Sequence, residues 1–416
     1  MVRVWLRSLF RRRRSFALLW TVGLAVRLAA GLRRVALPWL VVSRTGSPLQ
    51  LGATLALGSV DALLAPVVGS LVDHLPRRRV VAAGVILFGG GLVALPALAA
   101  VGALSLPAVY AVVVVLGVGQ FLHHVARQAW LPELVTDLDA ANAVVHGTDA
   151  ATQVVVLLAG GLLTAATTAT TALGVAGAAA LVGAVPLAAL PPGRADGRDE
   201  TSDSDETGPG LRPRALLSRT RTGVGYLRGP LAVLVAVAVG INLVMPAYSL
   251  FFAALGAATF EAALAYTVLL VGFEAGKLLG NGVVARADWD RTAALAGGVV
   301  ACGLATLGLA AVVAVGGGTT VGLAAAAVAA AVVGATQPAF NVPTDSVLQA
   351  SVPERDRGTV VGAANALYQL PFPLAYLGGG WLAARVSPAA GFAVAGGVLL
   401  AVGWVARGRL DTTMAA

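Results

Sequence analysis

The sequence predicts an all-α membrane protein with twelve transmembrane helices in two six-helix repeats. Three observations predict this fold class. Apolar residues make up 58% of the 416 residues and charged residues only 12%, about half the charged fraction of soluble domains. The apolar residues form runs long enough to cross a bilayer. Basic residues concentrate in every second connection between these runs, as expected for a chain that crosses the membrane repeatedly.

The apolar runs define two sets of six predicted spans. The first set is Phe16–Val42, Leu49–Val72, Val80–Val101, Leu106–Val125, Val144–Ala166 and Thr171–Leu190. The second set is Leu231–Leu255, Phe260–Val284, Thr292–Val315, Val321–Asn341, Thr359–Leu382 and Ala389–Ala406. The 51 glycines are scattered through these runs. Small residues suit helices in lipid because they let the backbones approach closely.

A polar segment separates the two groups of six predicted spans and therefore defines the predicted domains. Residues 1–190 form an N-terminal six-helix bundle, residues 191–229 a cytoplasmic linker and residues 230–416 a C-terminal six-helix bundle. The linker contains an acidic run at residues 199–206. Such a charged, polar composition cannot bury enough apolar surface to fold, so we expect part of the linker to be disordered.

The positions of the basic residues predict the orientation. With the N-terminus in the cytoplasm, 22 of the 29 Lys and Arg residues lie in cytoplasmic segments, and only Arg44 and Arg385 lie in outer loops. One missed span would reverse this bias for all later loops. We therefore expect a multi-pass protein of the cell membrane with both termini in the cytoplasm. The net charge of +9 is then explained by basic residues in loops that face the anionic cytoplasmic leaflet. We therefore expect no nucleic acid partner.

An internal repeat relates the two halves. An offset of 213 residues aligns Asp61 with Glu274 and Gly69 with Gly282 along the second and eighth predicted spans. A parallel duplication of six helices is a transporter architecture, with the solute site between the halves. A receptor or a structural membrane protein would not need such a repeat.

The cytoplasmic end of the second predicted span carries a spaced motif. Gly69 is followed by Asp73, and then by Arg77, Arg78 and Arg79. This pattern resembles the loop motif of the major facilitator superfamily. The resemblance implies a conformational role, in which Asp73 braces the two halves in one state of the transport cycle. For the three arginines, a simple topology signal remains the alternative.

Further stretches are similar to the efflux branch of that superfamily that includes macrolide and enterobactin exporters. They are residues 34–41, 126–134, 341–343 and 352–358. The sequence departs from the family pattern in three places. His74 and Pro76 stand where the loop motif has a basic residue and a Gly, and Ala30 stands where many branch members have an acidic residue. We therefore expect residue 30 to have no role in energy coupling.

Ionisable residues inside predicted spans are candidates for energy coupling. Arg27 and Asp61 lie at mid-depth of the first two spans, and Glu274 and Lys277 lie on the eighth. Charges at such depth cost at least ~2.5 kcal/mol and therefore mark cavities or partners. One hypothesis makes Asp61 the main residue that takes up a proton, with Arg27 as its partner. The other makes Asp61–Arg27 and Glu274–Lys277 permanent structural pairs, which the i,i+3 spacing of Glu274 and Lys277 favours.

Further polar residues complete the candidate set. Arg127 and Asp149 fall near the inner ends of the fourth and fifth spans and are expected to pair. The candidates for the solute cavity, each of which could instead hold helices together, are Arg34, Asn242, Tyr248, Gln337, Asn341, Tyr368 and Gln369.

These observations predict a secondary active transporter that exports a small, partly apolar molecule, drug-like or siderophore-like, in exchange for protons. An importer or uniporter of a small metabolite is the main alternative, sodium coupling is left open, and a membrane-embedded enzyme or receptor is more remote. His123 and His124 point about 100° apart on a helix and make a poor metal pair, and Cys302 is the only cysteine. We expect no cofactor, no metal and a monomer, with the substrate, protons and the lipid bilayer as partners.

Overall fold

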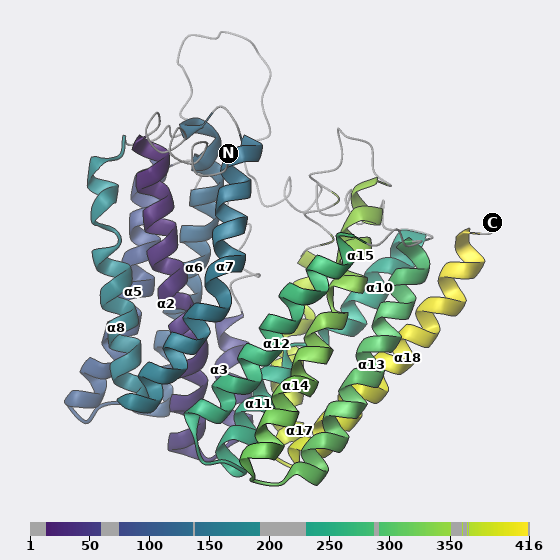
Figure 1. Cartoon of the computed structure of the whole chain (residues 1–416). Helices are drawn as coiled ribbons and strands as arrows, with labels where there is room; N and C mark the ends of the chain where they lie inside the picture. Colours follow the sequence, from purple (N-terminus) through teal and green to yellow (C-terminus); the bar gives the residue numbers. More distant parts are fainter. Residues whose placement is uncertain are drawn as a thin grey trace. The chain divides into compact units, whose positions relative to one another are not determined.

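The computed structural model describes residues 14–59, 75–135, 138–191, 230–286, 291–350, 360, 364 and 366–414, and every regular element in these ranges is a helix. Contacts divide the chain into two units. Unit 1 comprises residues 1–40 and 57–208, and unit 2 comprises residues 41–56 and 209–416. Figure 1 shows each unit as a bundle of long helices that run side by side. The predicted division at residues 190 and 230 stays a prediction.

Unit 1 contains most of α2 (Arg14–Thr45), followed by α5 (Arg77–Ala100), α6 (Leu106–Leu134), α7 (Leu138–Ala166), α8 (Ala169–Val182) and the short 3₁₀ helix η2 (Val185–Ala189). Unit 2 contains most of α3 (Pro48–Gly58), followed by α10 (Pro230–Asn242), α11 (Ala247–Ala258), α12 (Ala263–Val284), α13 (Arg291–Gly316), α14 (Thr320–Thr336), α15 (Pro338–Ala350), α17 (Pro371–Ala383) and α18 (Pro388–Met414).

Ten helical stretches among the described residues are long and apolar enough to cross a membrane. Each of them overlaps one of the twelve predicted spans. For the other two predictions, Leu49–Val72 and Thr359–Leu382, the structure describes α3 and α17, and parts of both ranges lie outside the described residues. The all-α membrane fold predicted from the sequence is therefore confirmed.

Two of the membrane-length stretches are interrupted along their length. Leu231–Ala258 contains a turn at residues 243–246 between α10 and α11, and Thr320–Thr344 contains a turn at Gln337 between α14 and α15. Pro246 and Pro338 stand at these two points. Proline has no backbone N–H and clashes with the preceding turn, so a helix bends or restarts there.

Close backbone contacts hold the helices of each unit together. In unit 1, a methyl group added to Gly84 of α5 would lie 2.5 Å from the backbone nitrogen of His123 on α6. In the same unit, one added to Gly160 of α7 would lie 3.1 Å from the Cα of Leu32 on α2. In unit 2, Gly272 faces the Ala327 carbonyl oxygen across the α12–α14 contact. These seams follow the small-residue rule for helices in lipid.

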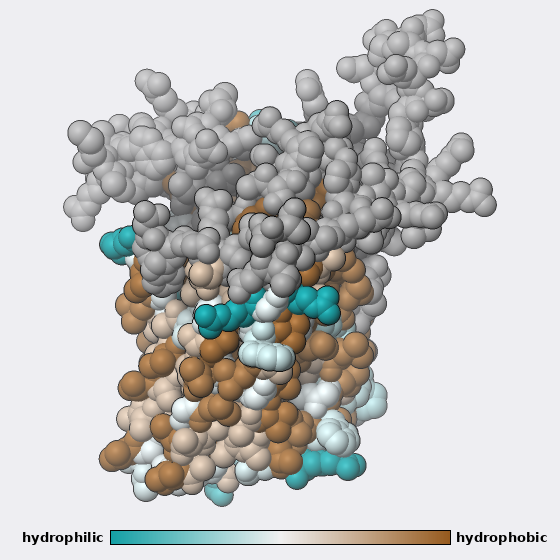
Figure 2. Space-filling view, turned by 90° about the vertical axis from the view of Figure 1, so that its right-hand side faces the viewer, coloured by the Kyte–Doolittle hydropathy of each residue, from teal (hydrophilic) through white to brown (hydrophobic). Residues whose placement is uncertain are grey.

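The outer surface of the described helices is largely apolar, as expected for contact with lipid. Large apolar side chains lie exposed along the spans, including Ile86, Val155, Leu279 and Trp404. Figure 2 shows one face, on which apolar side chains cover most of the described surface and hydrophilic ones gather near its ends. A water-soluble domain would not expose so many large apolar residues together.

Candidate functional site

Unit 1 contains a pocket of about 80 Å³ between α2, α6 and α7. Its wall combines apolar side chains with several charged and polar ones, all within membrane-spanning helices. The lining residues are Phe16, Leu19, Trp20 and Arg27 from α2, His124, Arg127, Gln128 and Leu131 from α6, and Val145 and Asp149 from α7. Polar groups that converge inside a span are the usual mark of a functional site.

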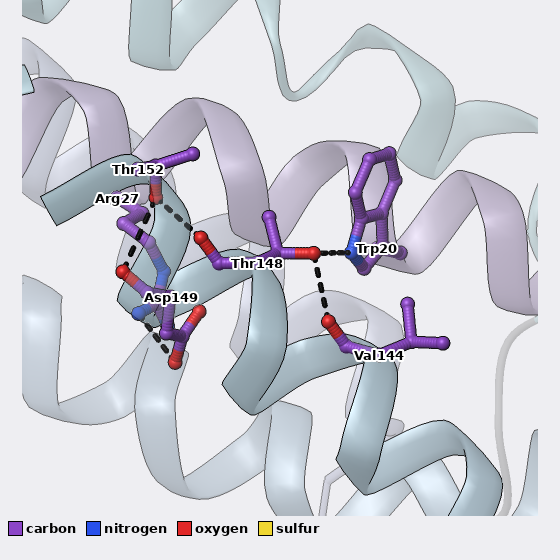
Figure 3. A network of polar contacts seen from close by, with 6 residues as sticks. All are labelled: Trp20, Arg27, Val144, Thr148, Asp149 and Thr152. Carbon is purple, nitrogen blue, oxygen red and sulfur yellow. Dashed lines mark hydrogen bonds and ion pairs between the residues drawn. The ribbon is translucent and has the colours of Figure 1, made fainter. Parts of the chain in front are cut away.

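An ion pair crosses this pocket. Arg27 Nη1 of α2 contacts the Asp149 carboxylate of α7, and both side chains are about one quarter exposed. Figure 3 shows the two side chains meeting between their helices. A close approach of the same two helices lies further along them, where a methyl group on Gly160 of α7 would lie 3.1 Å from the Cα of Leu32 on α2.

The pairing differs from the expectation for Asp149, which was that it would pair with Arg127. The structure joins Asp149 to Arg27, and Arg127 lies beside them as a second cation in the pocket wall. The Arg127 guanidinium packs against α2, where a methyl group on Gly23 would lie 2.9 Å from its Nη1 atom. Among the described residues, the buried Arg127 Nε has no hydrogen-bond acceptor.

Hydroxyl groups on α7 extend the polar network. The Trp20 indole donates a hydrogen bond to Thr148 Oγ1 at 3.3 Å, and Thr148 donates to the Val144 carbonyl at 2.7 Å. Thr152 donates to the Thr148 carbonyl at 2.7 Å. Of these bonds, drawn in Figure 3, the one from Trp20 joins α2 to α7, and the other two lie within α7. Trp20 was not among the residues predicted from the sequence, although it lies seven residues before Arg27 and thus on the same helix face.

The charges at this site do not balance. With Asp149 ionised, Arg27 and Arg127 leave one excess positive charge in the pocket wall. Protonation of Asp149 would remove the only carboxylate among the lining residues and leave two cations facing each other. Since like charges repel strongly where water is scarce, binding or release of one proton at Asp149 would change the electrostatic potential of the whole pocket.

The predicted pair in unit 2 is present. Lys277 Nζ lies 3.0 Å from Glu274 Oε2 on the same helix, and the Glu274 side chain is 4% exposed. Lys277 also lies over the Phe273 ring, at 5.8 Å from its centroid. The predicted partner of Arg27, Asp61, lies outside the described residues.

Several solute-cavity candidates of unit 2 connect helices in this structure. Asn242, at the end of α10, donates to the Tyr368 carbonyl at 3.0 Å, and Gln337 donates to the Met245 sulfur at 2.9 Å. Met245 and Gln337 stand at the two helix breaks, so this contact joins them. Tyr248 is fully buried, and its hydroxyl lies 2.6 Å from Thr306 Oγ1.

The remaining cavity candidates lie nearer the surface of the described structure. Arg34, Asn341 and Gln369 are exposed, and the Tyr368 side chain is half-buried. Broken helices are where transporters expose backbone groups to a solute. Asn242, Gln337 and Tyr368 therefore stay candidates because they surround the breaks, whereas Tyr248 is packed among aromatic rings such as Phe252 and Phe273.

The arginines of the loop motif hold the start of α5. Arg77 Nη1 lies 3.0 Å from Glu133 Oε1 on α6, and it also donates to the Ala129 carbonyl. Arg78 donates to the Leu190 carbonyl at 2.9 Å. Arg79 lies in the first turn of α5. Gly69 and Asp73 lie outside the described residues, so the bracing role of Asp73 stays a prediction.

Comparisons with known proteins agree on one family. The model of the Major Facilitator Superfamily matches residues 19–326. The multidrug efflux pump Tap of Mycolicibacterium fortuitum is 34% identical over 122 residues, a match that covers 27% of this chain and 30% of the pump.

Solved structures show the same fold. A bacterial homologue of the iron transporter ferroportin, in an inward-facing state, has a TM-score of 0.71 at 18% identity, over 97% of this chain and 99% of that one. The nucleoside transporter NupG has a TM-score of 0.66 at 14% identity, over 96% of this chain and 98% of that one. At these identities the likeness concerns the fold alone.

Proposed function

The chain belongs to the major facilitator superfamily, and on that premise we propose that it is a secondary active transporter that exports a small, partly apolar molecule in exchange for protons. Transport by alternating access is the mechanism that a duplication of six helices supports. We further propose a monomer in the cell membrane with both termini in the cytoplasm.

One observation carries the proton coupling. The Arg27–Asp149 ion pair lies within membrane-spanning helices, beside a second cation, Arg127. A proton that neutralised Asp149 would release Arg27 and add one unit of positive charge to the pocket. A cationic solute bound nearby would then be held less tightly. Exchange of a proton for such a solute is the direction that antiport requires.

Asp61 stays the alternative carboxylate for this role. It is the acidic residue that the sequence places at mid-depth of a span in the N-terminal half. Arg27 has one guanidinium, and in this structure that group contacts Asp149. A transport cycle in which Arg27 exchanges one carboxylate for the other would let either residue carry the proton. The experiment below separates the two.

The direction of transport rests on weaker support. The partial match to Tap, which is described as an efflux pump, favours export. An importer or uniporter of a small metabolite remains the second candidate, and the fold likeness to the nucleoside transporter NupG is compatible with it. The apolar walls of the pocket, which include Phe16, Leu19 and Leu131, favour a partly apolar solute.

The test uses purified full-length protein in vesicles that hold a pH-sensitive dye. Ethidium, macrolides and catecholate siderophores are added in turn under an imposed substrate gradient. We expect at least one of these compounds to drive proton movement in the opposite direction. Proton movement in the same direction as the solute would refute antiport. Transport without any proton movement would support a uniporter.

Matched variants locate the coupling residue. Asp149→Asn and Asp61→Asn each remove one carboxylate and keep its size, and Glu274→Gln serves as the control in unit 2. We expect the variant at the proton-carrying residue to exchange labelled solute at the wild-type rate but to lose accumulation driven by a pH gradient. If all three variants still accumulate solute with unchanged pH dependence, coupling does not use these carboxylates.

A further inference from the structure

Unit 2 contains an apolar groove of its own. It lies between α10 and α18 and has a volume of about 430 Å³. Its lining consists of alanine and valine side chains and one arginine, namely Val233, Ala236 and Val237 on α10, and Ala401, Val402, Val405 and Arg409 on α18. No function proposed so far uses these residues.

The groove follows from the side chains on the two helices. A methyl group on Gly240 of α10 would lie 3.0 Å from Val402, so the helices touch there. Towards the start of α10, the facing positions carry only Val233 and Ala236, whose short side chains do not fill the space. The result is a furrow with apolar walls that is open along one side.

Arg409 stands at one end of this furrow. In the sequence, Arg407 and Arg409 follow the apolar run Ala389–Ala406 on α18, and Leu231 opens the apolar run on α10. Basic side chains at the end of an apolar helix of this length suit the level of the lipid phosphate groups.

We propose that this groove binds one anionic phospholipid, with an acyl chain in the furrow and the phosphate group at Arg409. The furrow alone gives little preference, because lipid tails are as apolar as valine side chains. Selection must come from the charge at its end. A basic residue near a membrane surface favours an anionic lipid about fivefold, the equivalent of ~1 kcal/mol.

The binding test uses the full-length protein purified in a mild detergent and mixed with phosphatidylglycerol or phosphatidylcholine of the same acyl chains. Native mass spectrometry then counts the lipids that stay bound. We expect wild-type protein to retain phosphatidylglycerol in preference to phosphatidylcholine. Arg409→Gln should lower this preference about fivefold. Circular dichroism of each variant checks that the helices remain intact.

Two control variants make the test specific. Arg407→Gln removes the same charge from an exposed side chain that does not line the groove, and it should leave the preference unchanged. Ala236→Phe fills the furrow without a change in charge, and it should reduce retention of both lipids. Equal effects of Arg407→Gln and Arg409→Gln would overturn the proposal, since they would indicate only general surface charge. Equal retention of phosphatidylglycerol and phosphatidylcholine by the wild-type protein would also overturn the proposal, because it would indicate a groove that binds apolar molecules in general.

Discussion

The contact between α12 and α14 allows a quantitative prediction. Gly272, Gly276 and Gly280 stand four residues apart on α12, and each faces a carbonyl oxygen of α14. The oxygens belong to Ala327, Ala331 and Ala335, which share the same spacing. The two backbones are therefore in direct contact over about two turns. We predict that Gly272→Ala destabilises unit 2, although alanine is the better helix former.

The magnitude follows from the distance. A methyl group on Gly272 would lie 2.5 Å from the Ala327 carbonyl oxygen, whereas ordinary contacts begin at 3.4 Å. The helices would have to separate by about 0.9 Å at that point, or bend. Overpacking of this kind costs about 1–3 kcal/mol, and the helix preference for alanine returns up to about 1 kcal/mol. The net loss should be about 1–2 kcal/mol, or roughly 2–8 °C in melting temperature.

The assay is thermal unfolding of the purified protein in detergent, followed by tryptophan fluorescence. The matched control is Gly308→Ala on α13, because a methyl group there would meet nothing within 4 Å. We expect Gly308→Ala to melt at the wild-type temperature or slightly above it. The reasoning about the seam fails if Gly272→Ala melts no lower than Gly308→Ala.

Three further predictions test the charges and the topology. Lys277→Met should destabilise the protein by roughly 1–3 kcal/mol because it leaves the buried Glu274 without this cation. In a thermal melt, adding Glu274→Gln to the same chain should restore part of the lost stability. No recovery in the double variant would argue against the pair. Asp73→Asn should slow transport at equal expression, and wild-type turnover would exclude the bracing role. Cysteines at Ser105 and Ser387 should react with an impermeant reagent from outside the cell; labelling from the cytoplasm alone would contradict the predicted orientation.

The helices could be predicted because their signals are local. A run of about 20 apolar residues has few alternatives to a transmembrane helix, and the basic loops predict an even number of crossings. The two helix breaks were missed, although Pro246 and Pro338 stand at them. A proline in a span does not by itself reveal a break, since neighbouring helices often satisfy the freed carbonyl groups.

The two ion pairs also differ in whether they could be predicted from local sequence. The Glu274–Lys277 pair was predicted because both residues lie on one helix, at a spacing that brings their side chains together. The Arg27–Asp149 pair joins two helices, so it depends on tertiary packing. A single sequence places Arg27 at mid-depth and Arg127 and Asp149 near the inner ends of their spans, but it does not show which two of them touch.

The two units differ in how they compensate buried charge, and this difference bears on where coupling occurs. In unit 2, Glu274 has its cation one turn away on the same rigid helix, so the pair can persist through any movement of helices against each other. In unit 1, Asp149 depends on a cation from another helix, and a second cation competes for it. A small shift of α2 against α7 would break that contact. A proton-coupled cycle needs a carboxylate whose surroundings alternate, and unit 1 is the part of the described structure where helix movement can supply that change.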